Sequence, residues 1–314
     1  MAAISAQYPA NKPMKRIIVI DGCFANIIFP SNPAGLPVEA KAVTGGRLVK
    51  AASLLARAGR NVTVMGEAGR DPLGDLIMRH LDASGADTSC IDRYSDGNST
   101  PSVLIFPSSE GSRSIVYFKE FSERWDSKWP RTDASDIIVF GGFFPLQQRV
   151  RQRLVEFLTN ARQRGALTLY MPGFNPALAP AVTRVMPALL ENLEMADAVI
   201  TFTPDIVHLF GESDAARCFR DKISFYSPLM VNIDPANSTL TLFQGPDAVT
   251  RQISAECCSP SPLLSAIPVA RFATALSCLS IAPSTLGSLN IPTLESIADL
   301  TADVSTETSP TITL

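Results

Sequence analysis

The chain has 314 residues, of which 46% are apolar and only 18% are charged, against roughly 25% charged residues in an average soluble domain. Its net charge is −3 and it contains no run of Lys and Arg, which excludes the basic footprint of a nucleic-acid-binding protein. Only His80 and His208 are available for a histidine-based site, and each is expected to be structural or exposed.

The cysteines and the apolar segments bear on the compartment. The six cysteines form no CxxC pair, and Cys257 and Cys258 are adjacent, so we expect free thiols in a reducing environment. No segment approaches the ~20 consecutive apolar residues that span a bilayer. The sequence therefore predicts a soluble, cytoplasmic protein without a membrane partner.

Apolar periodicity predicts alternating strands and helices. Residues 16–20 form a continuous apolar run that ends at Asp21-Gly22, which is typical of a strand buried on both faces of a parallel sheet. Strands are also expected over 61–65, 137–140, 166–170 and 198–201, and helices over 46–58, 73–81, 150–161, 184–194 and 205–210. This order predicts an α/β fold with a doubly wound, mainly parallel sheet and helices on both faces.

Segments at about 24–43 and 102–118 interrupt this alternation. Each reads as strand, turn, strand, and the second has a turn rich in small polar residues. Together they predict a small antiparallel β lid that stands off a main domain of residues 15–300. Residues 1–14 are expected to form a flexible arm, and residues 301–314 a weakly ordered tail.

The glycine pattern in the amino-terminal half resembles a known family. Gly45-Gly46 precedes a helix of small residues that ends at Gly59, and Gly66 opens a Gly-x-x-Gly-x-Asp-x-x-Gly motif that ends at Gly74. This arrangement resembles the ribokinase/PfkB carbohydrate kinases, and the similarity runs from about residue 15 to 282. It implies a ribokinase-like fold that transfers the γ-phosphoryl group of ATP to a sugar hydroxyl, with Mg²⁺, an aspartate base and a lid that often mediates dimerisation.

The resemblance assigns substrate-binding roles to four residues. Gly45 and Gly46 match the glycine pair that lets a sugar approach the backbone at the start of a helix. Asn26 stands where the family usually has a sugar-binding carboxylate, and Lys50 replaces an asparagine. An amide still hydrogen-bonds a hydroxyl, while Lys50 either shifts the pocket toward an anionic ligand or projects into solvent.

Asp205 is the candidate near phosphate and metal. It lies where the family's Asn-x-x-Glu motif has its glutamate, whereas Phe202 takes the place of the asparagine. The alternative is a structural role, with Thr203 as the N-cap of a helix, Pro204 as its first residue and Asp205 facing the helix dipole. No residue is assigned with confidence as a metal ligand.

The second family signature, Asp-Thr-x-Gly-Ala-Gly-Asp, is missing. Its glycine amides form an anion hole and its last aspartate is the base, but residues 257–267 contain neither glycine nor aspartate. The position of the base falls at Leu263–Ser265, so no catalytic residue is assigned. The family's Asp, Asn and Arg in a preceding strand-end motif are likewise replaced, by Met171, Gly173 and Asn175.

These departures predict a PfkB-type carbohydrate-kinase-like protein with little or no kinase activity. ATP and Mg²⁺ are implied by the resemblance, but the lost residues put both in question; the expected ligand is a small sugar or nucleoside. One alternative is an active kinase with a base from elsewhere, Asp205 or Asp234. Another is a non-catalytic, dimeric regulatory protein that pairs through the lid.

Overall fold

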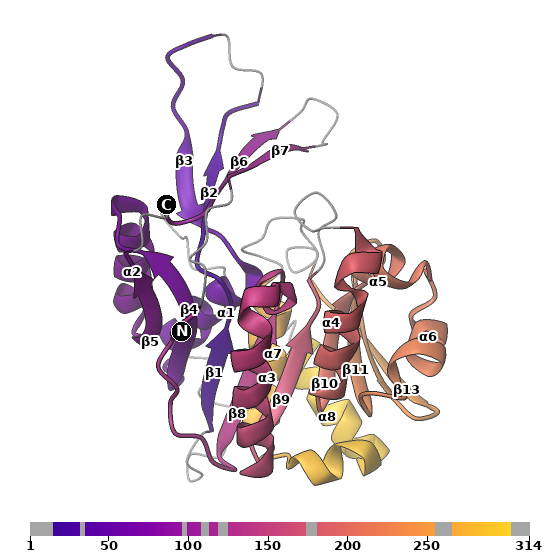
Figure 1. The fold of residues 1–314 in the computed structure, drawn as a ribbon. Helices are drawn as coiled ribbons and strands as arrows, with labels where there is room; N and C mark the ends of the chain where they lie inside the picture. Colours follow the sequence, from indigo (N-terminus) through magenta and orange to yellow (C-terminus); the bar gives the residue numbers. More distant parts are fainter. Residues whose placement is uncertain are drawn as a thin grey trace.

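A nine-stranded sheet forms the centre of the fold in the computed structural model, which describes residues 15–31, 35–95, 99–107, 113–118 (backbone only), 125–173, 181–254 and 266–302 (Figure 1). Its strands are, in spatial order, β13 (Asp247–Gln252), β12 (Thr239–Gln244), β11 (Leu229–Asp234), β10 (Ala198–Phe202), β9 (Leu167–Met171), β8 (Asp136–Gly141), β1 (Arg16–Ile20), β4 (Val62–Gly69) and β5 (Asp87–Tyr94). The strands from β11 to β5 are parallel, and β12 and β13 add an antiparallel edge.

β1 lies in the interior of this sheet. Ile17 is paired with Val62 on β4 and with Ile137 on β8. Ile17 and Ile18 point to opposite faces, and neither is exposed to solvent. A strand with apolar residues on both faces needs helices on both sides of the sheet, because either face would otherwise expose apolar surface.

Two layers of helices cover the sheet. One face carries α1 (Arg47–Arg57), α2 (Pro72–Ser84), α7 (Ile267–Cys278) and α8 (Ile291–Ala302), and the other carries α3 (Gln148–Gln163), α4 (Val182–Glu194), α5 (Thr203–Phe210) and α6 (Ala215–Cys218). Short 3₁₀ segments span Phe144–Leu146 and Pro283–Ser288, and a π-helical turn spans Phe219–Ile223. The predicted doubly wound α/β fold is confirmed, and α8 extends two residues beyond the predicted boundary at 300.

A separate four-stranded sheet projects from the edge of the main sheet (Figure 1). Its order is β3 (Lys41–Thr44), β2 (Ala25–Ile28), β6 (Ser102–Pro107) and β7 (Arg113–Phe118). The predicted small sheet is thus confirmed, although β2 and β6 run parallel rather than antiparallel. Phe29 and Phe106 stack with their ring centres 4.4 Å apart and join the two segments.

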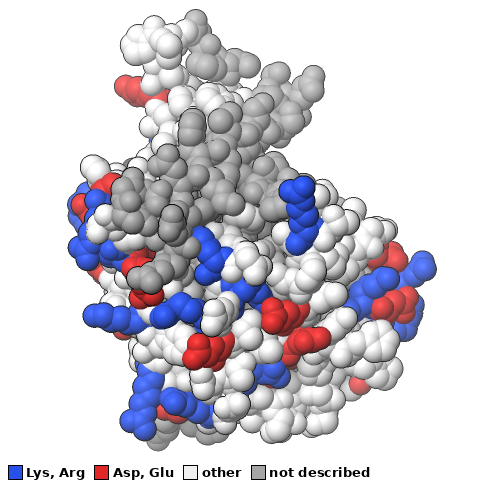
Figure 2. Space-filling model, viewed as in Figure 1, with Lys and Arg blue, Asp and Glu red and all other residues white. Residues whose placement is uncertain are grey.

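Charged side chains of both signs are interspersed on the face shown in Figure 2. Arg217 in α6 and Arg220 in the following turn both form ion pairs with Asp221. Within the described ranges, no helix has the length and apolarity needed to cross a membrane. Cys23, Cys90, Cys218 and Cys278 are free thiols, as predicted, whereas Cys257 and Cys258 lie outside the described residues.

Candidate functional site

The carboxyl ends of the neighbouring parallel strands β1 and β8 mark the position at which a doubly wound sheet is expected to have a crevice. The chain that follows β1 leads to α1 on one face, and the chain that follows β8 leads to α3 on the other. Neighbouring parallel strands whose connections diverge to opposite faces leave such a crevice, and open α/β sheets bind ligands there. Asp21 and Gly142 are the first residues after these strands.

Asp21, directly after β1, is a buried carboxylate with 4% of its surface exposed. Its Oδ1 accepts a hydrogen bond from the Gly22 amide at 2.8 Å, and the amides of Leu48 and Val49 in the first turn of α1 also donate to the carboxylate. Burial raises the pKa of Asp21 to about 7, although these amides and Arg47 favour the ionised form. Asp21, the residue directly after β1, therefore caps the first turn of α1.

The predicted glycine pair directly precedes α1, with Gly46 as the N-cap, and both positions are crowded by this chain's own side chains. A Cβ at Gly45 would overlap the ring of Phe24, and a Cβ at Gly46 would lie 2.9 Å from Oδ2 of Asp21. Gly46 also has a φ of +78°, which favours glycine. The fold thus requires both glycines, and their role toward a sugar stays a prediction.

The other two predicted substrate residues are Asn26, in the lid sheet, and Lys50, in α1. Asn26 is on β2 of the lid sheet, opposite Val43 and Val103, and is 5% exposed. Lys50 is one turn into α1 and only 4% exposed, so the alternative that it projects into solvent is wrong. Burial, followed by the charges of Arg57 and Lys50, lowers the pKa of His80 on α2.

Arg47 connects the two sides of the crevice. It is the first residue of α1, and its Nη1 lies 3.7 Å from Oδ2 of Asp205 in the first turn of α5. Its guanidinium carbon is 4.1 Å from the centre of the Phe202 ring, a cation–π contact. Burial lowers the pKa of Arg47, while Asp205 and Asp21 oppose that change.

Asp205 is 5% exposed and close to the amino terminus of α5. The helix begins at Thr203, with Phe202 as a cap residue that lacks a side-chain cap hydrogen bond, so the predicted Thr203 N-cap is wrong. Thr203 Oγ1 instead accepts a hydrogen bond from Asn232 Nδ2 at 3.1 Å. The reason is that Thr203 itself takes up helical geometry, and its hydroxyl is turned toward β11.

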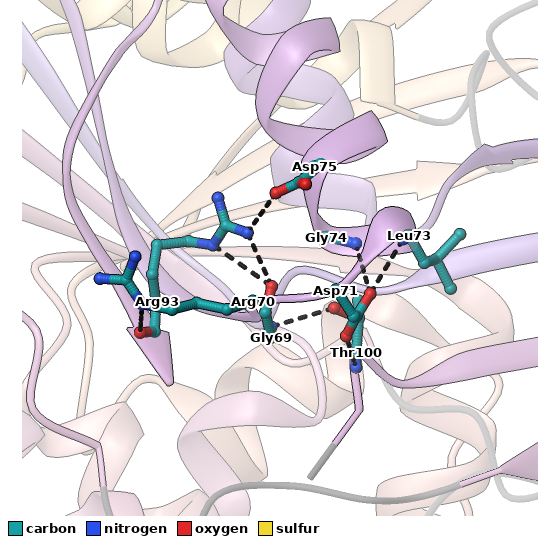
Figure 3. A network of polar contacts seen from close by, with 8 residues as sticks. All are labelled: Gly69, Arg70, Asp71, Leu73, Gly74, Asp75, Arg93 and Thr100. Atoms are coloured by element: carbon teal, nitrogen blue, oxygen red, sulfur yellow. Dashed lines mark hydrogen bonds and ion pairs between the residues drawn. The ribbon is translucent and has the colours of Figure 1, made fainter. Parts of the chain in front are cut away.

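The Gly-x-x-Gly-x-Asp-x-x-Gly motif has a structural explanation (Figure 3). Asp71 caps α2 through the amides of Leu73 and Gly74, both at 2.9 Å, and accepts a third bond from the Thr100 amide at 2.6 Å. Thr100 Oγ1 accepts from the Gly69 amide at 3.0 Å. Since Thr100 precedes β6, this network ties α2 and β4 to the base of the lid.

Several predicted positions are not placed by the structure. Leu263–Ser265 and Asn175 lie outside the described residues, and the description resumes at Ala266, just before α7. Met171 is buried at the end of β9. Asp234, one of the alternative bases, accepts hydrogen bonds from the Ala236 amide and from Asn237 in the turn between β11 and β12.

Sequence reasoning missed Asp21 and Arg47 as members of the site. Asp21-Gly22 was interpretable as a turn after a strand, and Arg47 as one polar residue at the start of a helix. The available signal for Asp21 was a carboxylate placed directly after a strand buried on both faces. Nothing in the spacing of Arg47 and Asp205 indicates that the two side chains meet.

This combination of a doubly wound sheet, a projecting β sheet and a glycine-started helix at the crevice is the architecture of ribokinase-like small-molecule kinases. The chain belongs to the pfkB family of carbohydrate kinases, whose model matches residues 14–221. No curated protein matches the sequence.

Solved structures agree with this assignment. A fructokinase from Xylella fastidiosa with bound ATP is similar with a TM-score of 0.72 and 18% identity, over 92% of this chain and 93% of that one. A fructokinase from Vibrio cholerae with fructose, ADP and potassium gives 0.74 and 13%, over 92% and 90%. An aminoimidazole riboside kinase from Salmonella enterica gives 0.72 and 13%, over 91% of each chain.

The Mg²⁺ implied by the family does not fit the carboxylate predicted for it. The charged neighbour of Asp205 at 3.7 Å is a guanidinium, and a second cation beside it would be repelled. Among the residues that the structure describes, no three His, Cys, Asp or Glu side chains gather as metal ligands. Mg²⁺ binds through carboxylate oxygens that are free to face it and its waters.

Proposed function

We propose that this PfkB-family protein binds a small sugar or nucleoside in the crevice and transfers phosphate from ATP to it slowly or not at all. The observation that supports the proposal is the contrast between the glycine pair, which is present, and the second family signature, which is missing. Gly45 and Gly46 still directly precede α1, whereas residues 257–267 contain no glycine and no aspartate.

The binding part rests on groups that suit a polyhydroxylated ligand. The amide of Asn26 both donates and accepts hydrogen bonds, and sugar hydroxyls do the same. Asn26 lies at the base of the lid sheet, which projects from the crevice edge. The fructokinase and aminoimidazole riboside kinase named above are similar in fold, and sugars or nucleosides are the ligand class that we carry over to this chain.

We infer impaired phosphoryl transfer from the absence of the family's aspartate base and anion-hole glycines in residues 257–267. In the family reaction the acceptor hydroxyl loses its proton to a base, its oxygen forms a bond to the γ-phosphorus, and ADP leaves. Loss of a general base typically costs about 10²–10⁴ in rate, and loss of an anion-hole donor costs about 10²–10³. Residues 257–267 also contain Pro260 and Pro262, which cannot donate backbone hydrogen bonds.

The displaced-base alternative finds little support in the two proposed residues. Asp205 lies 3.7 Å from Nη1 of Arg47, so its carboxylate is already engaged by a cation. Asp234 is engaged in its own turn. An active enzyme would therefore need a base from another part of the site.

Equilibrium binding tests the proposed function. Isothermal titration with a panel of sugars and nucleosides should find at least one ligand, and Asn26→Ala should bind it at least about tenfold more weakly, the cost of one or two hydrogen bonds. Thr241→Ala, which removes an exposed hydroxyl on β12, is the matched control and should leave affinity unchanged. A panel in which no sugar or nucleoside binds would contradict the proposal.

We also propose that the protein pairs through the lid. Leu36, in the connection between β2 and β3, is 91% exposed, which is unfavourable for an apolar side chain in a monomer. Light scattering should give about twice the chain mass of 33.7 kDa at micromolar concentration, and Leu36→Asp should shift the protein toward monomer. A monomeric wild-type protein would exclude a lid dimer.

A further inference from the structure

We propose that a cavity between α4, α5 and the chain that follows α6 binds a small aromatic carboxylate. These helices lie together on one face of the main sheet (Figure 1). Among the described residues that line the cavity, none is assigned to the crevice. The inference is therefore independent of the proposed function.

The cavity has the size and the walls of a small-molecule site. Its volume is about 350 Å³, and ligand pockets typically measure about 300–1,000 Å³. Met186 and Leu190 from α4 and Leu209 and Phe210 from α5 supply apolar walls. Ligand pockets are lined mainly by such side chains, with a few polar groups that fix the orientation of the ligand. These walls favour a ligand with an apolar body.

Two further aromatic side chains favour an aromatic body. Phe225 and Tyr226 line the cavity, and Phe225 is 80% exposed. A phenyl ring gains free energy when apolar surface covers it, and aromatic rings pair favourably in stacked or edge-to-face geometry. A ligand ring would therefore cover Phe225 and stay in contact with Tyr226.

Lys222 and Tyr226 supply the polar groups that a carboxylate would bind. Both line the cavity, and among the described residues neither the Lys222 ammonium nor the Tyr226 hydroxyl has an ion pair or a hydrogen bond. Both groups can donate hydrogen bonds to carboxylate oxygens. Lys222 lies in the π-helical turn Phe219–Ile223, and π-helical turns are rare and occur frequently at functional sites.

The charges around the cavity leave this ammonium available. Asp221 also lines the cavity, but Arg220 lies 2.9 Å and Arg217 3.6 Å from its carboxylate oxygens. Arg217 also pairs with Glu212 at 3.3 Å. Each of the two carboxylates therefore has a guanidinium beside it, and Lys222 is the cation that a ligand can still neutralise.

The test is the dissociation constant of three probes, phenylacetate, phenylacetamide and acetate, measured by ligand-observed NMR. Phenylacetate should bind with a Kd of about 1 mM or tighter, as expected for a ligand of about ten non-hydrogen atoms. Phenylacetamide has the same shape without the charge and should bind about three- to fivefold more weakly, the effect of one solvent-exposed ion pair. Acetate lacks the ring and should bind at least about tenfold more weakly.

Two variants locate the binding, each with a matched control. Lys222→Met keeps the stem and should bind phenylacetate and phenylacetamide equally, whereas Lys128→Met, at an exposed lysine outside the cavity, should keep the wild-type preference. Leu190→Glu places a carboxylate in the cavity and should abolish phenylacetate binding. Val207→Glu, at a position on α5 that is 42% exposed and does not line the cavity, should bind as wild type does.

The inference is wrong if wild-type protein binds phenylacetate no more tightly than acetate or phenylacetamide. It is also wrong if Leu190→Glu binds phenylacetate as wild type does, because the probe would then occupy another place. The three-probe comparison on wild-type protein decides even where a variant does not fold. The sugar and nucleoside titration decides the proposed function separately.

Discussion

Oδ2 of Asp21 lies 2.9 Å from the position that a Cβ of Gly46 would occupy, so the carboxylate at the end of β1 fills the space beside the first turn of α1. The amides of Leu48 and Val49 donate to this carboxylate. The Asp21 side chain thus joins the end of β1 to the start of α1, and the glycine at position 46 is tied to the identity of residue 21.

Gly46→Ala tests this relationship. We expect a loss of unfolding free energy larger than the ~1–2 kcal/mol of a left-handed backbone alone, because the added Cβ also meets Asp21. Gly59→Ala is the matched control, since Gly59 has a similar φ of +76° but no atom within 4 Å of the Cβ position. Equal losses of unfolding free energy for Gly46→Ala and Gly59→Ala, measured by urea unfolding, would show that the contact with Asp21 does not add to the destabilisation.

The raised pKa of Asp21 predicts a pH-dependent stability. An aspartate titrates near 4 in an unfolded chain but at about 7 here, so the folded state binds the proton more tightly. The stabilising contribution is fully present below about pH 4 and is lost as pH rises through about 7.

Asp21→Asn removes this titration and should therefore become more stable relative to wild type between pH 4 and 8, by up to about 4 kcal/mol. The measurement is urea unfolding of both proteins across this range. A difference between variant and wild type that does not change with pH would contradict the assignment.

The network at the base of the lid predicts a large effect for Asp71→Ala. The substitution removes the cap of α2, worth about 0.5–2 kcal/mol, and also leaves the Thr100 amide without its carboxylate partner. Asp75→Ala in the same helix is the control, because its side chain is 53% exposed and its ion pair with Arg93 is worth at most about 1 kcal/mol. Chemical unfolding should rank Asp71→Ala as the more destabilising; the reverse order would count against the network.

A buried ion pair between β4 and the start of α3 predicts a second strong effect. Glu67 is fully buried, and Arg149 donates to both of its carboxylate oxygens, one at 2.8 Å. Glu67→Gln leaves Arg149 without a matching charge, and breaking a buried pair in this way costs about 3–5 kcal/mol.

Arg217→Gln, in an exposed pair with Glu212, should change stability by less than about 1 kcal/mol. Thermal unfolding of the two variants distinguishes them. If Glu67→Gln unfolds at the wild-type temperature, the ion pair between Glu67 and Arg149 does not stabilise the fold.

Much of the main sheet follows from the sequence. Strands such as β1 and β8 are short apolar runs buried on both faces, and helices such as α1 and α3 have an apolar side. Both patterns can be recognised in the sequence without tertiary information. β5 reads as Asp-Thr-Ser-Cys-Ile-Asp-Arg-Tyr, with polar residues at a sheet edge, and was not predicted. An edge strand needs fewer apolar residues, because only one neighbour covers it.

The site shows where such reasoning ends. The positions of Gly45 and Gly46 could be predicted because a helix start after a glycine pair is a local feature. The meeting of Arg47 with Asp205 depends on helices from opposite faces converging at one sheet edge, and that convergence is set by the whole topology. The capping of α1 by Asp21 is likewise a contact between segments separated by the lid strands.

The charge-poor composition is concentrated in the carboxy-terminal part of the chain. Between residues 257 and 294, Arg271 is the only charged residue. This stretch includes the segment in which the resemblance expects the aspartate base. The low charge content is thus linked directly to the proposed loss of phosphoryl transfer.

The most direct test of that proposal is the rate of ADP release at saturating ATP, Mg²⁺ and each sugar or nucleoside that binds in the titration. The account predicts less than about 0.1 s⁻¹ for every ligand, well below the ~10 s⁻¹ median of enzymes, from protein whose binding of the same ligand has been measured. A ligand-dependent rate above that value with any of them would contradict it.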